Sequence, residues 1–130
     1  MTDRREPGPG NRWQQAHAAL LRDSFRRLTG RALLPADAGA DAARALYEAP
    51  FVVVSHDTAA DPVFDYANRC AQRLFDMAWA DFVRTPSRLS AEPVHRDERA
   101  ALMARVSRDG FIDDYRGIRV TATGRRFRIG

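Results

Sequence analysis

Two groups of strand-like residues lie on either side of a long helical stretch, and this order is the strongest constraint on the fold. The run Phe51–Val54 is continuous and β-branched, and turn-forming residues follow at 57–62. Near the carboxyl end, apolar and polar residues alternate over 115–121 and 125–129. We expect both groups to lie side by side in one antiparallel sheet that wraps the helical middle, which predicts an α+β domain.

The residues before the first strand predict two helices. Asn11 can cap a helix over about 12–29, and Gly30 suits the position just past its end. A shorter helix over 41–49 stops before Pro50. The first helix is amphipathic, and its apolar stripe is Trp13, His17, Leu20, Leu21, Phe25 and Leu28.

Residues 51–129 predict two hairpins with further helices between them. The strand Phe51–Val54, expected to be buried on both faces, pairs with a second strand over 63–66. Asn68 caps the next helix, and another follows within 77–83. A loop over 85–93, a helix over 94–108 and the final hairpin complete the order, with the hairpin's arginines on its solvent face. The predicted core is Phe51, Val53, Phe64, Leu74, Phe75, Phe82, Leu102, Ile118, Val120 and Phe127.

Composition limits the chain to one domain. Its 130 residues, 45% of them hydrophobic, suffice for a core without disulfides. Residues 1–10 read as a disordered lead-in, 11–40 as a helix with its loop, and 41–130 as the main domain. One cysteine, no signal peptide and no apolar run long enough to cross a bilayer predict a cytoplasmic protein without a membrane partner.

The positive charge is modest. All 21 basic residues are arginines, 17 acidic residues are interspersed with them, and the net charge is +4. The absence of lysine suggests a coding bias towards GC-rich codons more than selection for anion binding, so nucleic acid is not the favoured partner.

Several segments carry a family resemblance. They are Ser55-His56-Asp57-Thr58, Asp61-Pro62-Val63-Phe64, Tyr66-Ala67-Asn68, Leu74-Phe75, residues 86–92, Arg96, Glu98-Arg99, Gly110-Phe111-Ile112, residues 115–119 and residues 124–127. Over about residues 41–129 the chain resembles the MEKHLA domain family, which is related to PAS domains.

The resemblance implies a PAS-like antiparallel sheet with helices on one face, preceded here by the amphipathic helix, and a role in sensing or small-ligand binding. It also implies a further strand after the hairpin. Because the sequence stops at Gly130, we expect the last strand of the sheet to be missing.

No residue pattern predicts catalysis or a metal site. Ser55, His56 and Asp57 are consecutive, so on a strand His56 would point away from the other two. The remaining histidines, His17 and His95, do not lie at metal-ligand spacing. Haem is not favoured, because His56 and His95 are the only candidates for an axial ligand and neither position indicates that role. Flavin is not favoured, because Cys70 lacks the surrounding motif of light-sensing PAS relatives. The cofactor, if there is one, is unknown from sequence.

The loop 86–92 is the candidate binding region. It places an arginine fork, a hydroxyl and a carboxylate within seven residues, and the resemblance brings further polar side chains near it. The candidate ligand-binding residues are Tyr66, Arg88, Ser90, Glu92, Arg99, Tyr115 and Arg119. The alternative is an internal network, with Arg88 or Arg99 paired to Glu92 and Ser90 as a cap.

The favoured function is therefore a PAS-like sensory or small-ligand-binding module that is not an enzyme. It would signal by homodimerisation or by binding a partner protein through the helix 12–29. The alternatives are a structural interaction domain with a filled core, a small enzyme, and nucleic-acid binding through the arginine-fringed hairpin.

Overall fold

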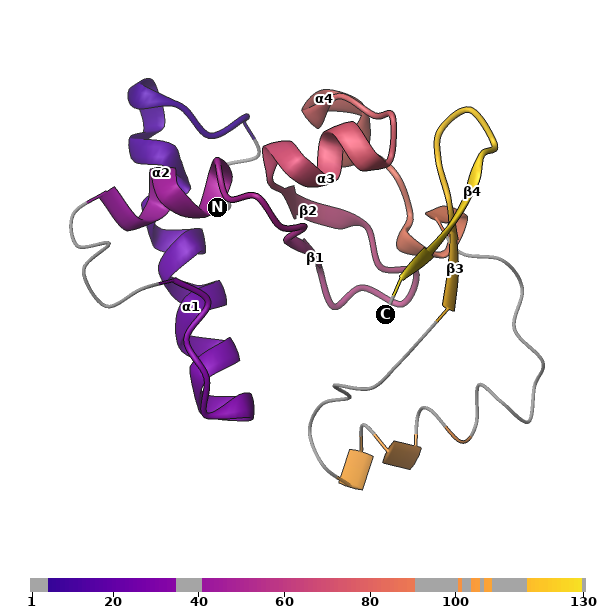
Figure 1. Cartoon of the computed structure of the whole chain (residues 1–130), viewed down its shortest axis with the longest axis horizontal. Helices are drawn as coiled ribbons and strands as arrows, with labels where there is room; N and C mark the ends of the chain where they lie inside the picture. The colour runs from indigo at the N-terminus through magenta and orange to yellow at the C-terminus, as the bar shows by residue number, and fades with distance from the viewer. Residues whose placement is uncertain are drawn as a thin grey trace.

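The computed structural model describes residues 5–34, 41–90 and 117–129, with positions 101, 104, 105, 107 and 108. Its described part is a mixed α+β structure with two antiparallel sheets of two strands each (Figure 1). At the five separate positions the backbone is helical; the rest of the predicted helix 94–108 lies outside the described residues.

The N-terminal helix begins with an irregular turn, η1 (Pro9–Gln14), and continues as α1 (Gln15–Thr29). Gly30 ends it at φ 72° and donates its N–H to the Arg26 carbonyl, which confirms its predicted position. The predicted apolar stripe is only partly buried. The α1 side chain that is fully buried is Ala18, whereas Leu20 and Leu28 are 55% and 49% exposed.

Residues before the helix contact the body of the protein, although the sequence predicts disorder for 1–10. Pro7 is buried, and the Tyr47 hydroxyl donates a hydrogen bond to Glu6. The Gln14 side-chain amide donates to the Arg5 carbonyl at 2.7 Å. These contacts tie residues 5–7 to α1 and to the following helix.

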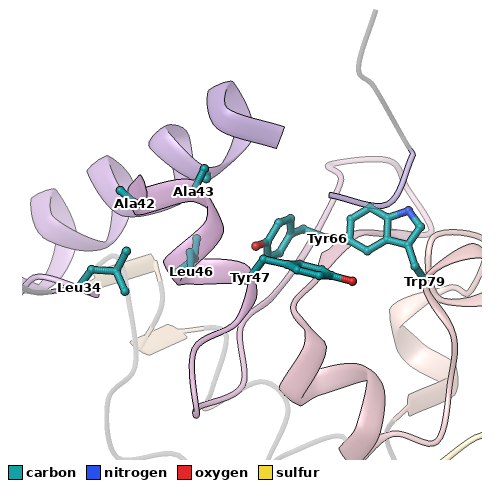
Figure 2. Packing of buried hydrophobic residues seen from close by; sticks show 8 residues of the cluster. Leu34, Ala42, Ala43, Leu46, Tyr47, Tyr66 and Trp79 are labelled. Carbon is teal, nitrogen blue, oxygen red and sulfur yellow. The ribbon is translucent and has the colours of Figure 1, made fainter. Parts of the chain in front are cut away.

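That helix, α2 (Ala42–Tyr47), lies within the predicted range 41–49 and packs against α1. Its small residues Ala42 and Ala43 allow close approach, and its end carries two large buried side chains, Leu46 and Tyr47. Figure 2 shows the Tyr47, Tyr66 and Trp79 rings gathered beside this helix. The cluster consists of Ala18, Leu34, Ala42, Ala43, Leu46, Tyr47, Tyr66 and Trp79.

A first hairpin is present, as predicted, and pairs β1 (Val54–His56) with β2 (Phe64–Ala67). The predicted bounds of its first strand are wrong, because β1 begins only at Val54, the last residue of the predicted strand Phe51–Val54. The prediction that Phe51–Val54 is buried on both faces is wrong. Phe51 and Val52 are each 39% exposed and Val54 is 38% exposed. Phe51 and Val52 precede β1, and the segment forms part of a two-stranded sheet that is not covered on both faces as a central strand of a larger sheet would be.

A register shift in the hairpin decides which way its side chains point. Ser55 pairs with Tyr66, but His56 pairs with Phe64, so Asp65 is an extra residue in β2. A bulge of this kind breaks the alternation of side chains along a strand. Phe64 consequently packs in a different cluster from Tyr66, although the two are only two residues apart.

Two short helices follow, α3 (Arg69–Leu74) and α4 (Trp79–Phe82). The predicted cap is confirmed, because the Asn68 Oδ1 accepts a hydrogen bond from the Ala71 N–H at 3.1 Å. Predicted burial is confirmed for Phe75 and Phe82, and Trp79, which the predicted core omits, is buried as well. The second buried cluster consists of Phe64, Ala67, Ala71, Phe75 and Phe82, and Phe127 packs against it.

The second hairpin pairs β3 (Gly117–Val120) with β4 (Arg126–Ile129), as predicted. It is a separate sheet, so the prediction of one sheet joining both hairpins is wrong for the described residues (Figure 1). Contacts other than strand pairing hold it in place. The Phe127 ring meets Phe75 at 5.0 Å, and the Ala122 N–H donates to the Phe75 carbonyl.

The edge of β2 that faces away from β1 forms backbone hydrogen bonds with a later segment of the chain. The segment 85–87 runs along it, with hydrogen bonds from the Phe64 N–H to the Thr85 carbonyl and from the Ser87 N–H to the Pro62 carbonyl. This segment leads into η3 (Ser87–Ser90), which contacts β3.

The predicted division of the second hairpin into an apolar face and an arginine face is also wrong. Arg119 pairs across the strands with Phe127, and Val120 pairs with Arg126. Because cross-strand partners share a face, Arg119 lies on the side of the Phe127 ring, towards the protein. Of the predicted core, Phe51 is exposed, while Leu102 and the Ile118 side chain lie outside the described residues.

Candidate ligand pocket

A pocket of about 270 Å³ opens between the two hairpins. Its wall comes from β1, β2, the end of α3, η3 and β3. The lining residues are Val52, Val54, His56, Phe64, Leu74, Phe75, Ser87, Ser90 and Arg119. Five of these are apolar, and a few polar groups complete the wall, which is the composition typical of small-molecule sites.

Strand alternation supplies one side of the pocket. Val52, Val54 and His56 follow one another at every second residue, so their side chains share a face of the extended chain. The intervening Ser55 points to the opposite face, where it contacts α1. The bulge at Asp65 adds Phe64 to the pocket side, paired with His56.

The polar side of the pocket is formed by η3 and β3. The Ser90 hydroxyl is buried and donates a hydrogen bond to the Ser87 carbonyl at 2.7 Å. The Arg119 Nη1 in turn donates to the Ser90 Oγ at 3.4 Å. Within the described residues the Arg119 guanidinium makes this single polar contact, and no described carboxylate forms an ion pair with it.

The structure brings together two of the sequence-predicted site residues, Ser90 and Arg119. Arg88 does not line the pocket: its exposed guanidinium pairs with Asp61, with 3.1 Å between Nε and Oδ1. Tyr66 packs with Tyr47 and Trp79 in the buried cluster beside α2, on the other side of the first hairpin. Glu92, Arg99 and Tyr115 lie outside the described residues.

Sequence reasoning missed most of the apolar wall as binding residues. Val52, Val54, Phe64, Leu74 and Phe75 resemble ordinary core positions, and two of them were assigned to a strand expected to be fully covered. The regular spacing of Val52, Val54 and His56 is a signal for a shared face. The spacing alone does not distinguish a face that lines a pocket from a face that is packed in the core.

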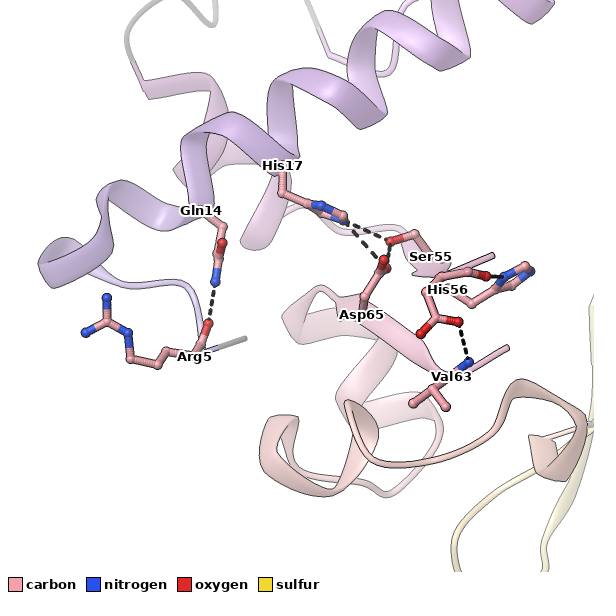
Figure 3. A network of polar contacts seen from close by, with 8 residues as sticks. Arg5, Gln14, His17, Ser55, His56, Val63 and Asp65 are labelled. Carbon is pink, nitrogen blue, oxygen red and sulfur yellow. Dashed lines mark hydrogen bonds and ion pairs between the residues drawn. The ribbon is translucent and has the colours of Figure 1, made fainter. Parts of the chain in front are cut away.

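A second polar group joins α1 to the opposite face of the first hairpin. The His17 Nε2 lies 3.1 Å from the Ser55 Oγ, and the Ser55 hydroxyl donates to Asp65 at 2.5 Å. The His17 ring also stacks on Tyr66, with 5.5 Å between ring centroids. Figure 3 shows His17 directed at Ser55 and Asp65, while the His56 ring points away from them.

This group is not arranged as a nucleophile with its base. In a catalytic triad the carboxylate orients the histidine, and the histidine accepts the serine proton. Here the serine proton goes to the carboxylate of Asp65, so the hydroxyl can only accept from His17. The arrangement holds α1 against the hairpin.

Two tyrosines near this group have displaced pKa values. Burial, together with the hydrogen bond to Glu6, raises the pKa of Tyr47 to about 12. Burial raises the pKa of Tyr66 further still above its usual value, and its hydroxyl has no hydrogen-bond partner among the described residues. Both phenols are therefore neutral at physiological pH.

The model of one protein family matches residues 15–130, that of the MEKHLA domain. The match covers most of the chain and begins well before residue 41, the start of the segments that carry the resemblance. This chain belongs to the MEKHLA domain family. It therefore contains a PAS-related domain. A comparison with curated proteins finds none that matches it.

The MEKHLA assignment rests on sequence, so it does not depend on the two hairpins forming one sheet. Apart from Val52 and Val54, every residue that lines the pocket belongs to one of the segments that carry the resemblance. The match from residue 15 also makes α1 part of the MEKHLA domain instead of an addition to it.

Over the described stretches 5–34, 41–90 and 117–129, no three His, Cys, Asp or Glu side chains gather as a metal site would require. None of the described helices has the length and apolar character to cross a bilayer.

Proposed function

We propose that this MEKHLA domain is a sensory module that binds a small molecule in the pocket between its hairpins. The observation that carries the proposal is the exposure of Val52 and Val54, at 39% and 38%, on a pocket wall that also holds buried aromatic rings. A ligand that covered these side chains would remove apolar surface from water, which stabilises the complex.

The placement of the pocket suggests how binding would act on the rest of the domain. A ligand would touch Val54 and His56 on the first hairpin and Arg119 on the second, and the described strands of these hairpins share no ladder. It would therefore favour conformations in which the two hairpins are held at one distance, because only these provide both sets of contacts.

The same strand connects the pocket to α1. Val54 and His56 face the pocket, and Ser55 between them bonds with His17 on the other face. Any movement of β1 on ligand binding would reach α1 through this contact. The exposed Leu20 and Leu28 give α1 an apolar surface, through which we propose that a second copy of the chain associates.

We also propose that the domain is not an enzyme. Among the described pocket residues His56 is the one side chain suited to proton transfer near neutral pH, since arginine stays charged. The His56 Nδ1 lies 2.7 Å from the Asp57 carbonyl, and no described carboxylate pairs with the ring. Within the described pocket wall, His56 would have to act without a second titratable side chain beside it.

The pocket proposal can be tested with 1-octanol, a small neutral amphiphile, by isothermal titration calorimetry. The unmodified protein is expected to bind it saturably at one site. Val54→Trp fills the pocket and should abolish this binding. The control Ala19→Trp places the same side chain at an exposed position of α1 outside the proposed association surface and should leave the binding intact.

Binding that survives Val54→Trp would place the site elsewhere. If neither octanol nor its carboxylate counterpart binds, the domain acts as a structural interaction module with a filled core, and the sensory proposal fails.

A further inference from the structure

We infer that the ligand is a small amphipathic monoanion whose carboxylate binds Arg119, an inference that rests on the proposed function of the pocket. Three features of the site carry it: the direction of Arg119, the state of its hydrogen-bonding groups, and the size and chemistry of the space beside it.

The hairpin register directs Arg119 towards the pocket. Arg119 is opposite Phe127 on the same face, and the Phe127 ring packs at 5.0 Å on Phe75, itself a pocket residue. By contrast Arg126 and Arg128, on the other face of the same hairpin, are exposed. Of these three arginines, Arg119 alone is half-buried and lines the pocket.

Its guanidinium has capacity for an anion. It carries five N–H donors, and its contact within the described residues is a single long bond of 3.4 Å to the Ser90 Oγ. The Ser90 hydroxyl already gives its proton to the Ser87 carbonyl. It therefore presents only a lone pair to Arg119 and helps to orient the guanidinium. A carboxylate can take two of the remaining donors in the planar fork geometry that arginine favours.

The space beside the guanidinium suits an apolar tail. Val52, Val54, Phe64, Leu74 and Phe75 form the remainder of the wall, and a tail of hydrocarbon would cover them. The volume of about 270 Å³ lies close to the lower end of the range of about 300–1,000 Å³ for drug-sized ligands, which favours a small anion.

A single arginine also favours a monoanion. A phosphate monoester carries up to two charges, and sites for it use several cationic or backbone donors. Within the described pocket wall Arg119 is the one permanent positive charge. One carboxylate matches this charge.

The test compares two probes of equal chain length, octanoate and 1-octanol, by calorimetry on the full chain. Octanoate is expected to bind at least about tenfold more tightly than octanol, because it adds a charge-assisted pair to the same apolar contact. Arg119→Gln should weaken octanoate about tenfold and change octanol less than about twofold. The control Arg128→Gln, on the exposed face of the hairpin, should change neither.

Arg119→Lys keeps the charge but loses the fork, so it should recover octanoate binding only in part. Octyl phosphate and acetate complete the set. If octyl phosphate binds more tightly than octanoate, the inference that the ligand carries a carboxylate is wrong. If acetate binds as tightly as octanoate, the inference that the ligand carries an apolar tail is wrong.

The possible failures are distinguishable. If octanol binds as tightly as octanoate, or Arg119→Gln leaves octanoate unchanged, the anion inference is wrong and the pocket proposal stands. If neither eight-carbon probe binds, both fall. Circular dichroism of each variant establishes that it is folded before its binding is compared.

Discussion

Asn68 does more at the residue scale than cap a helix. Its Oδ1 accepts from the Val53 and Ala71 N–H groups, and its Nδ2 donates to the Leu46 and Phe51 carbonyls. This one buried side chain therefore joins α2, the approach to β1, and α3. The cap could be predicted from sequence, because Asn precedes a helical pattern. The other three bonds could not, since they depend on chain segments up to 22 residues away.

We expect Asn68→Ala to lower the free energy of unfolding by about 3 kcal/mol, because it leaves several buried backbone groups without partners. Asn68→Asp keeps the acceptor and loses the donor, so its cost should also be large and should come from the two unpaired carbonyls. Urea unfolding followed by circular dichroism measures both. A loss below about 1 kcal/mol for Asn68→Ala would show that the network is not formed.

The buried tyrosines give a pH prediction. A tyrosine in the unfolded chain titrates near pH 10, and burial raises the pKa of Tyr47 to about 12. The unfolded state therefore releases this proton first as the pH rises. The contribution to stability is fully present below about pH 10 and is lost as the pH rises towards 12. Tyr66 shifts in the same direction.

Phenolate absorbance measures this directly. Of the three tyrosines in the sequence, Tyr47 and Tyr66 should ionise in the native protein well above pH 10, while all should ionise near pH 10 in urea. Tyr47→Phe should remove one of the delayed transitions. Native titration of all tyrosines near pH 10 would contradict their burial.

At the element scale, local signals explain what the sequence could predict. The helix end at Gly30, the helix start at Asn68 and the strands of the second hairpin are predicted correctly. Each of these features is determined by residues that are close together in the sequence. The bulge at Asp65 left no such signal, and it separates Tyr66 from Phe64 and from the pocket. The direction of Arg119 was available in principle: a turn over 122–124 already pairs residue 119 with 127.

The exposed apolar side chains of α1 lead to the prediction that two copies of the chain associate through this helix. Leu20 and Leu28 lie on the helix surface at 55% and 49% exposure, and a second copy of α1 would cover them. The double substitution Leu20→Glu with Leu28→Glu should convert a dimer into a monomer. Ala19→Glu, an exposed position on a different side of α1, is the control and should leave the dimer. Light scattering after size-exclusion chromatography decides, and an unmodified protein that is monomeric would refute the proposal.

At the scale of the whole molecule, the prediction of an α+β domain is confirmed and that of a single sheet is not. Pairing between strands that are far apart in the sequence is difficult to predict, because it depends on no local pattern. In the described residues the two hairpins are not joined by strand pairing; instead, Phe127 of the second hairpin packs on Phe75. The proposed ligand site does not require a common sheet, because the pocket lies between the separate hairpins.

The most direct test of this pocket is nuclear magnetic resonance of the methyl-labelled protein with octanoate. The account predicts intermolecular contacts from the octanoate chain to the methyl groups of Val52, Val54 and Leu74, with none to Leu20 or Leu28 on α1. Contacts confined to Leu20 and Leu28, or no contact to any of the three pocket residues, would contradict the claim that this MEKHLA domain binds its ligand between the hairpins.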